Sequence, residues 1–136
     1  MYEYKIKEVI RVIDGDTVDV LIDLGFNLTK KERVRVAGVD TPECRTRDSQ
    51  EKALGRQASA FAERWFSEGE IIVRTEKDGK YGRMLGVFLK GSESYNKRLV
   101  DEGYAFEYHG AKKQKDWNIL IERRKAAGCW IPEAEW

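Results

Sequence analysis

The chain has 136 residues, of which 41% are hydrophobic and 36% are charged, a composition that argues against disorder and is typical of a soluble globular protein. This length suits one domain, 1–136, with a real core, and no apolar run approaches the ~20 residues that cross a bilayer. The net charge of +1 neither favours nor excludes a nucleic-acid binder, because overall charge governs steering rather than site chemistry.

The amino terminus and the cysteines limit the cell compartment and the kind of site. Residues 1–5 are charged and lack the apolar core of a signal peptide, so we expect an intracellular protein as given, or a secreted one if a signal peptide has been removed. Cys44 and Cys129 lie far apart, and free thiols are favoured over a disulfide. His109 is the single histidine, which disfavours a zinc site of the usual kind and a serine–histidine nucleophile.

Three strands are predicted in the first third of the chain. Residues 5–13 carry β-branched residues in partial alternation, and residues 18–23 alternate apolar with polar side chains. Turn residues at 14–16 and at 25–27 follow the first and second strands. A third strand ends near Asp40 and is marked by Val34, Val36 and Val39.

A helix follows a polar loop. Pro42 ends regular strand pairing, and residues 43–50 are polar. From Gln50 to about Ser67 the apolar residues recur at helical spacing, and Gly69 closes the segment. The expected buried face comprises Leu54, Ala58, Phe61, Ala62, Trp65 and Phe66.

The second half predicts two more strands and two helices. The strands begin at Ile71 and Met84, the helices cover about 93–102 and 117–127, and Gly128 ends the last one. Five strands with three helices fit an α+β, mainly β fold, a five-stranded oligonucleotide-binding (OB-fold) barrel with helices packed outside. Periodicity alone does not choose this barrel over other α+β folds.

The segment Asp40-Thr41-Pro42-Glu43 is the most informative for function. Asp16 and Asp40 each end or begin a predicted strand, and their carboxylates, with the Thr41 carbonyl, are the oxygen ligands that a hard cation such as Ca²⁺ prefers. Glu43 lies close enough in sequence to act as general base on a water. The pattern points to metal-assisted cleavage of a phosphodiester.

Two arginines complete this set. The guanidinium groups of Arg35 and Arg83 each present a planar fork that matches two phosphate oxygens. Taken alone, each piece has a plainer interpretation: an ordinary turn, a solvated strand residue, or a strand entry. Order, spacing and chemical role together favour the nuclease interpretation.

The ordered set resembles the staphylococcal nuclease (thermonuclease-like) family over nearly the whole chain. The segments that carry the resemblance are 12–18, Arg35, 39–43, 51–52, Gly55, 58–61, 80–83 and Trp130. The resemblance implies the five-stranded barrel with three helices, and we expect the protein to act as a monomer. It also implies calcium-dependent hydrolysis of DNA and RNA that leaves 3′-phosphates, and we expect single strands to be the preferred substrate. The alternative is a catalytically inactive relative that binds nucleic acid or protein.

The resemblance also implies a role for individual residues. Asp16, Asp40 and the Thr41 carbonyl match the calcium ligands, and Asp14 matches a carboxylate just behind them. Glu43 matches the acid that activates or orients water, and Arg35 and Arg83 match the phosphate-binding arginines. The expected nucleotide contacts are Lys80, Tyr81, Tyr108 and His109.

The remaining aromatic and basic residues favour structural roles. Trp65, Trp117 and Trp130 are predicted to lie in the core, because they lie on or beside helices with apolar faces. Residues 112–115 form a basic cluster that is interpreted as a solvated helix start, with contact to nucleic acid as the alternative.

Overall fold

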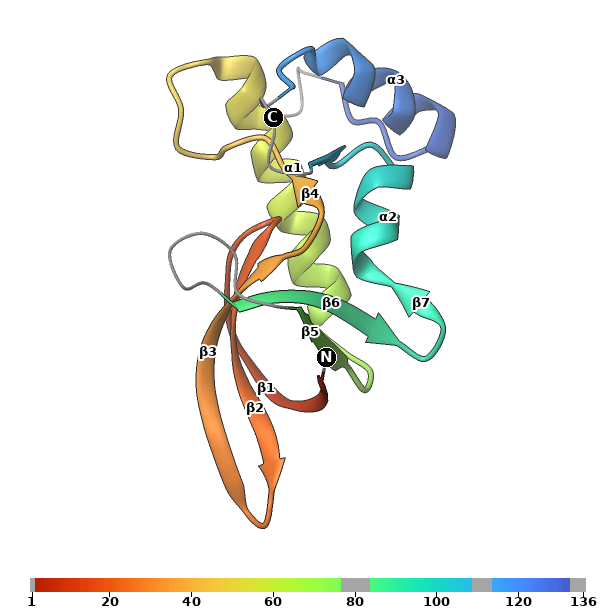
Figure 1. Ribbon diagram of the computed structural model, residues 1–136. Coiled ribbons are helices and arrows are strands. Elements are labelled where there is room, and N and C mark those ends of the chain that lie inside the picture. The colour runs from red at the N-terminus through yellow and green to blue at the C-terminus, as the bar shows by residue number, and fades with distance from the viewer. Residues whose placement is uncertain (1, 77–83, 109–113, 133–136) are drawn as a thin grey trace.

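The computed structural model describes residues 2–76, 84–108 and 114–132 (Figure 1). Five long strands form the body of the fold: β1 (Tyr2–Asp14), β2 (Thr17–Gly25), β3 (Leu28–Val36), β5 (Ile72–Glu76) and β6 (Met84–Lys90). The shorter strands are β4 (Val39–Asp40), β7 (Glu93–Ser94) and β8 (Phe106–Glu107). The helices are α1 (Ser49–Phe66), α2 (Tyr95–Asp101) and α3 (Trp117–Ala127).

The five long strands close into a barrel. β1, β2 and β3 form an antiparallel meander, β5 pairs with β1, and β6 pairs with β5. The ring closes where β6 runs parallel to β3, with Arg35 opposite Leu85. This mixed five-stranded barrel with helices outside it confirms the predicted α+β fold of the oligonucleotide-binding type.

Alternation along β2 fills the barrel interior. Val18, Val20 and Ile22 are fully or almost fully buried, as their spacing predicts. β1 is longer than expected and its pairing with β2 shifts register at three places, which bends and twists it. Because of this coiling, the start of β1 pairs with β5 while the rest of the strand pairs with β2.

The β2–β3 hairpin extends away from the helices (Figure 1). Its turn residues Phe26 and Asn27 have φ angles of 53° and 62°, the left-handed conformation that tight hairpin turns require. Phe26 is 96% exposed at the tip. The turn predicted at 25–27 is therefore confirmed.

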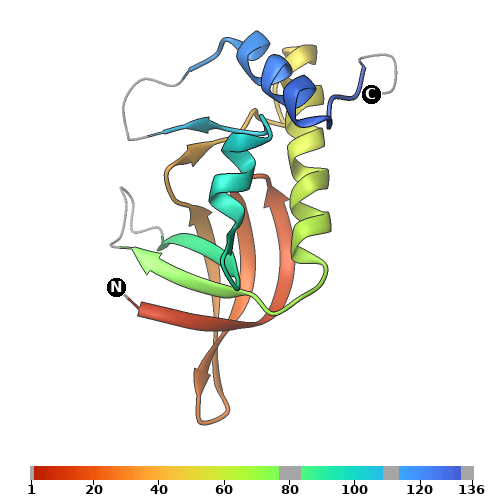
Figure 2. The ribbon, with the colours of Figure 1, turned by 90° about the vertical axis from the view of Figure 1, so that its right-hand side faces the viewer.

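Helix α1 supplies one wall of the core. The Asp48 carboxylate caps its first turn by accepting hydrogen bonds from the N–H groups of Gln50 and Glu51. Figure 2 shows α1 standing beside the barrel, with α3 crossing near its amino-terminal end. Rings of Phe61, Phe66 and Tyr95 pack together with Trp65 and Phe88 between helix and barrel. None of the helices in the described ranges is both long and apolar enough to cross a membrane.

Not every predicted feature of the core is found. Trp65 is buried as predicted, whereas Trp117 and Trp130 are only partly buried, so the core prediction for these two is wrong. The strand predicted to end near Asp40 is divided into β3 and β4, and β7 and β8 were not predicted, because two residues are too few to show a period of two. β4 and β8 pair with each other, with Asp40 opposite Phe106.

Arg124 joins the carboxyl-terminal helix to the rest of the molecule. Its side chain is wholly buried, and it donates hydrogen bonds to the carbonyls of Gly103 and Leu54 and to the side chain of Gln57. The guanidinium also lies over the ring of Tyr104, 4.8 Å from its centroid. Burial lowers the pKa of Arg124 to about 10, so the group keeps its charge at neutral pH.

Arg124→Ala is therefore expected to lower the free energy of unfolding by about 3 kcal/mol or more, because it leaves a cavity and several unpaired buried acceptors. Urea denaturation followed by circular dichroism measures this loss. The neighbouring Arg123→Ala is the matched control, since Arg123 is partly exposed and its ion pair with Glu107 is worth less than about 1 kcal/mol. Equal losses in the two variants would contradict the anchoring role of Arg124.

Candidate active site

Three segments far apart in sequence line one small hollow of about 180 Å³. The β1–β2 turn contributes Asp14 and Asp16, and β3 contributes Arg35. β4 and the loop after it contribute Asp40, Thr41, Pro42 and Glu43. The hollow thus gathers every sequence-predicted catalytic or metal-ligating residue that lies within the described ranges.

Asp16 is the most deeply placed carboxylate of the hollow. Its residue is only 8% exposed, and its Oδ2 accepts a hydrogen bond of 3.2 Å from the backbone N–H of Thr41. The Thr17 hydroxyl donates to its Oδ1 at 3.1 Å. Because a buried carboxylate needs such partners, Asp16 holds the Asp40–Glu43 loop against the β1–β2 turn.

Arg35 lies between the two aspartates. Its neighbours Val34 and Val36 point into the barrel, so the alternation of the strand turns Arg35 outward. Its Nη1 is 3.5 Å from Asp16 Oδ2, and its Nη2 is 3.6 Å from Asp40 Oδ1. The guanidinium also donates to the Val36 carbonyl at 3.1 Å, which fixes it against its own strand.

The carboxylates of Asp14 and Asp16 have opposite pKa shifts. Burial, with the hydrogen bond and charge of Asp16, raises the pKa of Asp14 to about 7. Burial also acts to raise the pKa of Asp16, but the hydrogen bond from Asp14, the charge of Arg35 and the bonds from Thr41 outweigh it and lower that pKa. Asp16 therefore loses its proton at a lower pH than Asp14 does.

The oxygen atoms around this hollow suit a hard cation. Among the described residues, no group of three or more histidine, cysteine, aspartate or glutamate side chains is gathered at metal-binding distances. Two ionisable carboxylates, Asp16 and Asp40, do converge on one guanidinium, and the Thr41 carbonyl belongs to the same wall. Oxygen donors of this kind can hold Ca²⁺, with water completing the coordination.

Close contacts at two glycines set the position of the Asp40–Glu43 loop. A Cβ at Gly55 of α1 would lie 2.7 Å from the Pro42 carbonyl oxygen, and one at Gly15 would lie 2.9 Å from Thr41 Cγ2. The buried Tyr95 hydroxyl donates to the Gly15 carbonyl. The sequence motifs contain both glycines but give no sign of Tyr95, whose spacing indicates only a buried helix position.

Comparison with known proteins decides the family. The family model described as staphylococcal nuclease homologue matches residues 33–128. The chain belongs to the staphylococcal nuclease family.

Several proteins with similar sequences are named for nuclease activity. A thermonuclease of Staphylococcus hyicus is 37% identical over 100 residues, which cover 72% of this chain and 56% of that protein. A thermonuclease of Staphylococcus intermedius is 34% identical over 115 residues, covering 83% and 65%. Endonuclease YncB of Bacillus subtilis is 33% identical over 98 residues, covering 70% and 44%. The chain thus spans less than two thirds of the length of each of these relatives.

Family membership leaves some of the predicted site residues without a structural test. Lys80, Tyr81, Arg83 and His109 lie outside the described residues. Tyr108 follows β8 and is partly buried, and its backbone N–H donates to the Gly38 carbonyl at 2.8 Å. It is not among the residues that line the hollow with Asp16 and Asp40. Its predicted role in nucleotide contact therefore stays a prediction.

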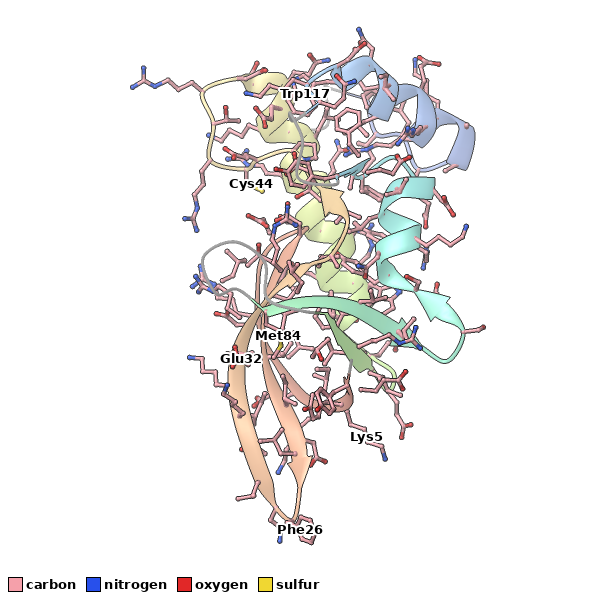
Figure 3. All side chains as sticks on the ribbon, in the orientation of Figure 1. Lys5, Phe26, Glu32, Cys44, Met84 and Trp117 are labelled. Atoms are coloured by element: carbon pink, nitrogen blue, oxygen red, sulfur yellow. The ribbon has the colours of Figure 1, made fainter. Side chains whose placement is uncertain are left out.

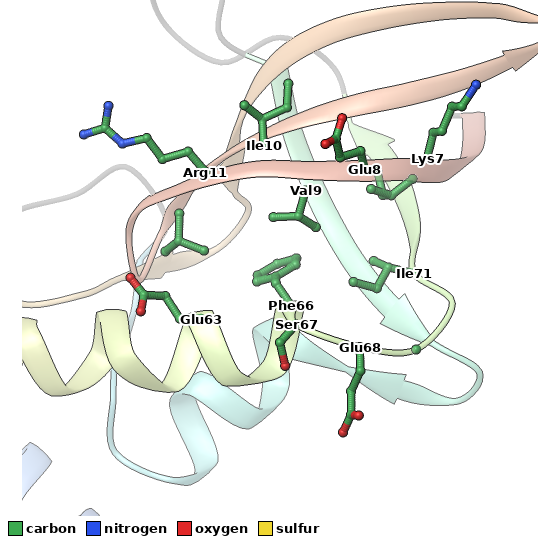
Figure 4. A pocket seen from close by; sticks show the side chains of 13 residues that line it. Lys7, Glu8, Val9, Ile10, Arg11, Glu63, Phe66, Ser67, Glu68 and Ile71 are labelled. Carbon is green, nitrogen blue, oxygen red and sulfur yellow. The ribbon is translucent and has the colours of Figure 1, made fainter.

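A larger groove lies elsewhere on this family member. About 650 Å³ is enclosed between β1 and the carboxyl-terminal end of α1, with Val9, Phe66 and Ile71 at its base (Figure 4). Its rim carries charges of both signs, among them Arg11 and Glu63. The smaller hollow is the better candidate for an active site, because there the carboxylates and the arginine converge on one point.

Gly55→Ala is expected to destabilise the protein by about 1–3 kcal/mol, because the added methyl group must displace the backbone at Pro42 and Glu43. The sign is diagnostic, since the same replacement at an open helical position stabilises by up to about 1 kcal/mol. Urea unfolding measures the change. Ala60→Gly, at an exposed position of the same helix, is the control for helix propensity alone. We expect it to lower the free energy of unfolding by about 1 kcal/mol. A more stable Gly55→Ala variant would show that the loop does not press on α1.

Proposed function

We propose that this chain is a calcium-dependent nuclease that hydrolyses phosphodiester bonds of DNA and RNA. It acts as a monomer, prefers single strands and leaves 3′-phosphates. The convergence of Asp16, Arg35 and Asp40 on one hollow, with Glu43 at its exposed side, is the observation that carries the proposal. The names of the relatives support the same activity.

Arg35 binds the scissile phosphate in this proposal. The planar guanidinium can give two parallel hydrogen bonds to phosphate oxygens. Its distances of 3.5 and 3.6 Å to the two aspartates are longer than charge-assisted hydrogen bonds, so an incoming phosphate competes with loose ion pairs. As negative charge builds on the phosphate oxygens, the bonds from Arg35 strengthen, which favours the transition state over the bound substrate. Arg83 would bind the same group from its own segment.

Asp16, Asp40 and the Thr41 carbonyl would hold the calcium ion. When bound, calcium supplies positive charge that offsets the charge of the phosphate and lowers the barrier to attack. Asp14 accepts a hydrogen bond from the backbone N–H of Asp16 and so orients the turn from behind. Its role is that of a positioning residue.

Glu43 would take the proton from the attacking water. The residue is exposed, and its backbone N–H donates to the Glu51 carboxylate at 3.1 Å, which ties the loop to the first turn of α1. Its side chain lines the hollow beside Asp40 and Thr41. A carboxylate so placed can accept a proton from water as that water attacks phosphorus.

Lys80, Tyr81, Tyr108 and His109 are proposed to contact the nucleotide beyond this phosphate. The proposal for these four residues comes from the family resemblance alone.

Purified protein should shorten single-stranded DNA and RNA in buffer with Ca²⁺, and a chelator should abolish the cleavage, because the carboxylates then lose the cation that lets them share a site with phosphate. A denaturing gel with calcium, magnesium or chelator measures this. Binding of an oligonucleotide without shortening would favour the inactive binding module instead.

Arg35→Lys keeps the positive charge between Asp16 and Asp40 but removes the planar fork. We expect kcat to fall on the order of a hundredfold or more, with unfolding by urea little changed. Arg33→Lys is the matched control, because Arg33 lies two positions away on β3, is 63% exposed in its side chain, and pairs with Asp19 outside the hollow. Similar rates for both variants would remove Arg35 from the mechanism.

A further inference from the structure

A second hollow of about 190 Å³ adjoins the first. The two hollows share three lining residues, Asp40, Thr41 and Glu43. Of the residues that the structure describes, Thr46, Glu51, Gln114, Lys115 and Trp117 also line the second hollow. A group bound there would lie next to one bound between Arg35 and the aspartates.

We propose that this second hollow is a subsite for the nucleobase next to the scissile phosphate, with Trp117 as its stacking platform. The inference rests on the proposed function, since it places the substrate strand beside the reacting phosphate. A strand bound in the catalytic hollow must continue past it, and the shared wall makes the adjoining hollow the next place along that path.

Trp117 is held in place from two sides. Its indole N–H donates to the Asp48 carboxylate at 3.3 Å, and its ring packs on Phe106 with centroids 6.0 Å apart and planes inclined by 35°. Phe106 in turn is paired with Asp40 across the β4–β8 ladder. The indole is thus fixed relative to the Asp40 backbone while it remains partly exposed.

An anchored, partly exposed tryptophan is what base stacking needs. An aromatic ring fixed in advance loses little conformational freedom when a base stacks on it, and every base offers a flat face. Figure 3 shows Trp117 near the amino-terminal end of α1, where its indole N–H reaches Asp48. Trp117 lines the second hollow together with Asp40, Thr41 and Glu43 of the catalytic loop.

The charged side chains of the second hollow can bind the edge of a base. Among the described residues that line this hollow, the charged side chains are those of Asp40, Glu43, Glu51 and Lys115. A base edge carries no charge and offers both donors and acceptors. Carboxylates can accept from the amino and imino groups of a base.

The amide of Gln114 adds a donor. Its Oε1 accepts hydrogen bonds from the backbone N–H groups of Lys115 and Asp116, at 2.9 and 3.0 Å. These bonds orient the amide and leave its NH₂ group as the end that can donate to a base. The Thr46 hydroxyl accepts from the Asp48 N–H and can donate its own proton in the same way.

Binding can be tested without catalysis by NMR of the ¹⁵N-labelled full chain. Deoxynucleoside 5′-monophosphates should shift the Trp117 indole N–H signal, which the Trp117→Phe variant assigns, and inorganic phosphate at equal concentration should not. An indole signal that ignores the nucleotides, or responds equally to phosphate, would overturn the base subsite. Because no cleavage is needed, this result is independent of whether the protein is a nuclease.

Kinetics on dinucleoside monophosphates, which hold a single phosphodiester, test the role in turnover. Trp117→Ala should lower kcat/KM on the order of tenfold for the full dinucleotide, in line with the loss of one stacked base. Two abasic analogues each lack one of the two bases. Trp117→Ala should leave unchanged the rate on the analogue that lacks the base occupying the subsite. Phe26→Ala, which removes an exposed aromatic ring at the distant hairpin tip, should change neither rate.

The outcomes separate the two ideas. Equal losses on the dinucleotide and on both abasic analogues would assign Trp117 a purely structural role and overturn the subsite. Failure of the wild-type protein to cleave any of these compounds, together with a nucleotide-specific shift of the Trp117 indole signal, would remove the nuclease function and keep the base-binding site.

Discussion

The buried Asp16 carboxylate is the constraint on which the architecture around the hollow depends. A charge withdrawn from water must be matched by hydrogen bonds or an opposite charge, and the Thr41 N–H, the Thr17 hydroxyl and Arg35 supply both. These three partners come from the β4 loop, β2 and β3, so one carboxylate fixes the relative position of three segments. The backbone carbonyl of Asp16 also accepts a hydrogen bond from the Val36 N–H.

The barrel and α1 make this arrangement rigid from behind. Glycines at 15 and 55 let the turn, the loop and the helix approach within distances that a side chain would prevent. Tyr95 and Asn96 extend the support from α2: the first bonds to the Gly15 carbonyl, and the second bonds to the carbonyls of Ala37 and Gly86. Polar groups at the rim, such as Glu43, can therefore be exposed while their backbone is held by buried contacts.

Much of the fold could be predicted from periodicity, and the exceptions have physical causes. The long strands and α1 repeat a local pattern over enough residues to be recognised, and α3 was bounded correctly by Trp117 and Gly128. The bulges of β1 and the β4–β8 ladder were not predictable, because both depend on pairing with distant segments. The partial burial of Trp117 was missed for the same reason: helical spacing gives its face but not what covers it.

The sequence by itself determined the chemical inventory: which carboxylates, arginines and glycines are present, in what order, and on strands or loops. That inventory was enough to place the chain in its family, because the family's motifs are defined by residue type and order along the chain. Only the tertiary structure decided which of these groups meet. The hydrogen bond between Thr41 and Asp16 spans 25 positions, and the contact between Phe106 and Trp117 joins a strand to a helix. Such neighbours are set by barrel closure and long-range pairing, for which local periodicity carries no information.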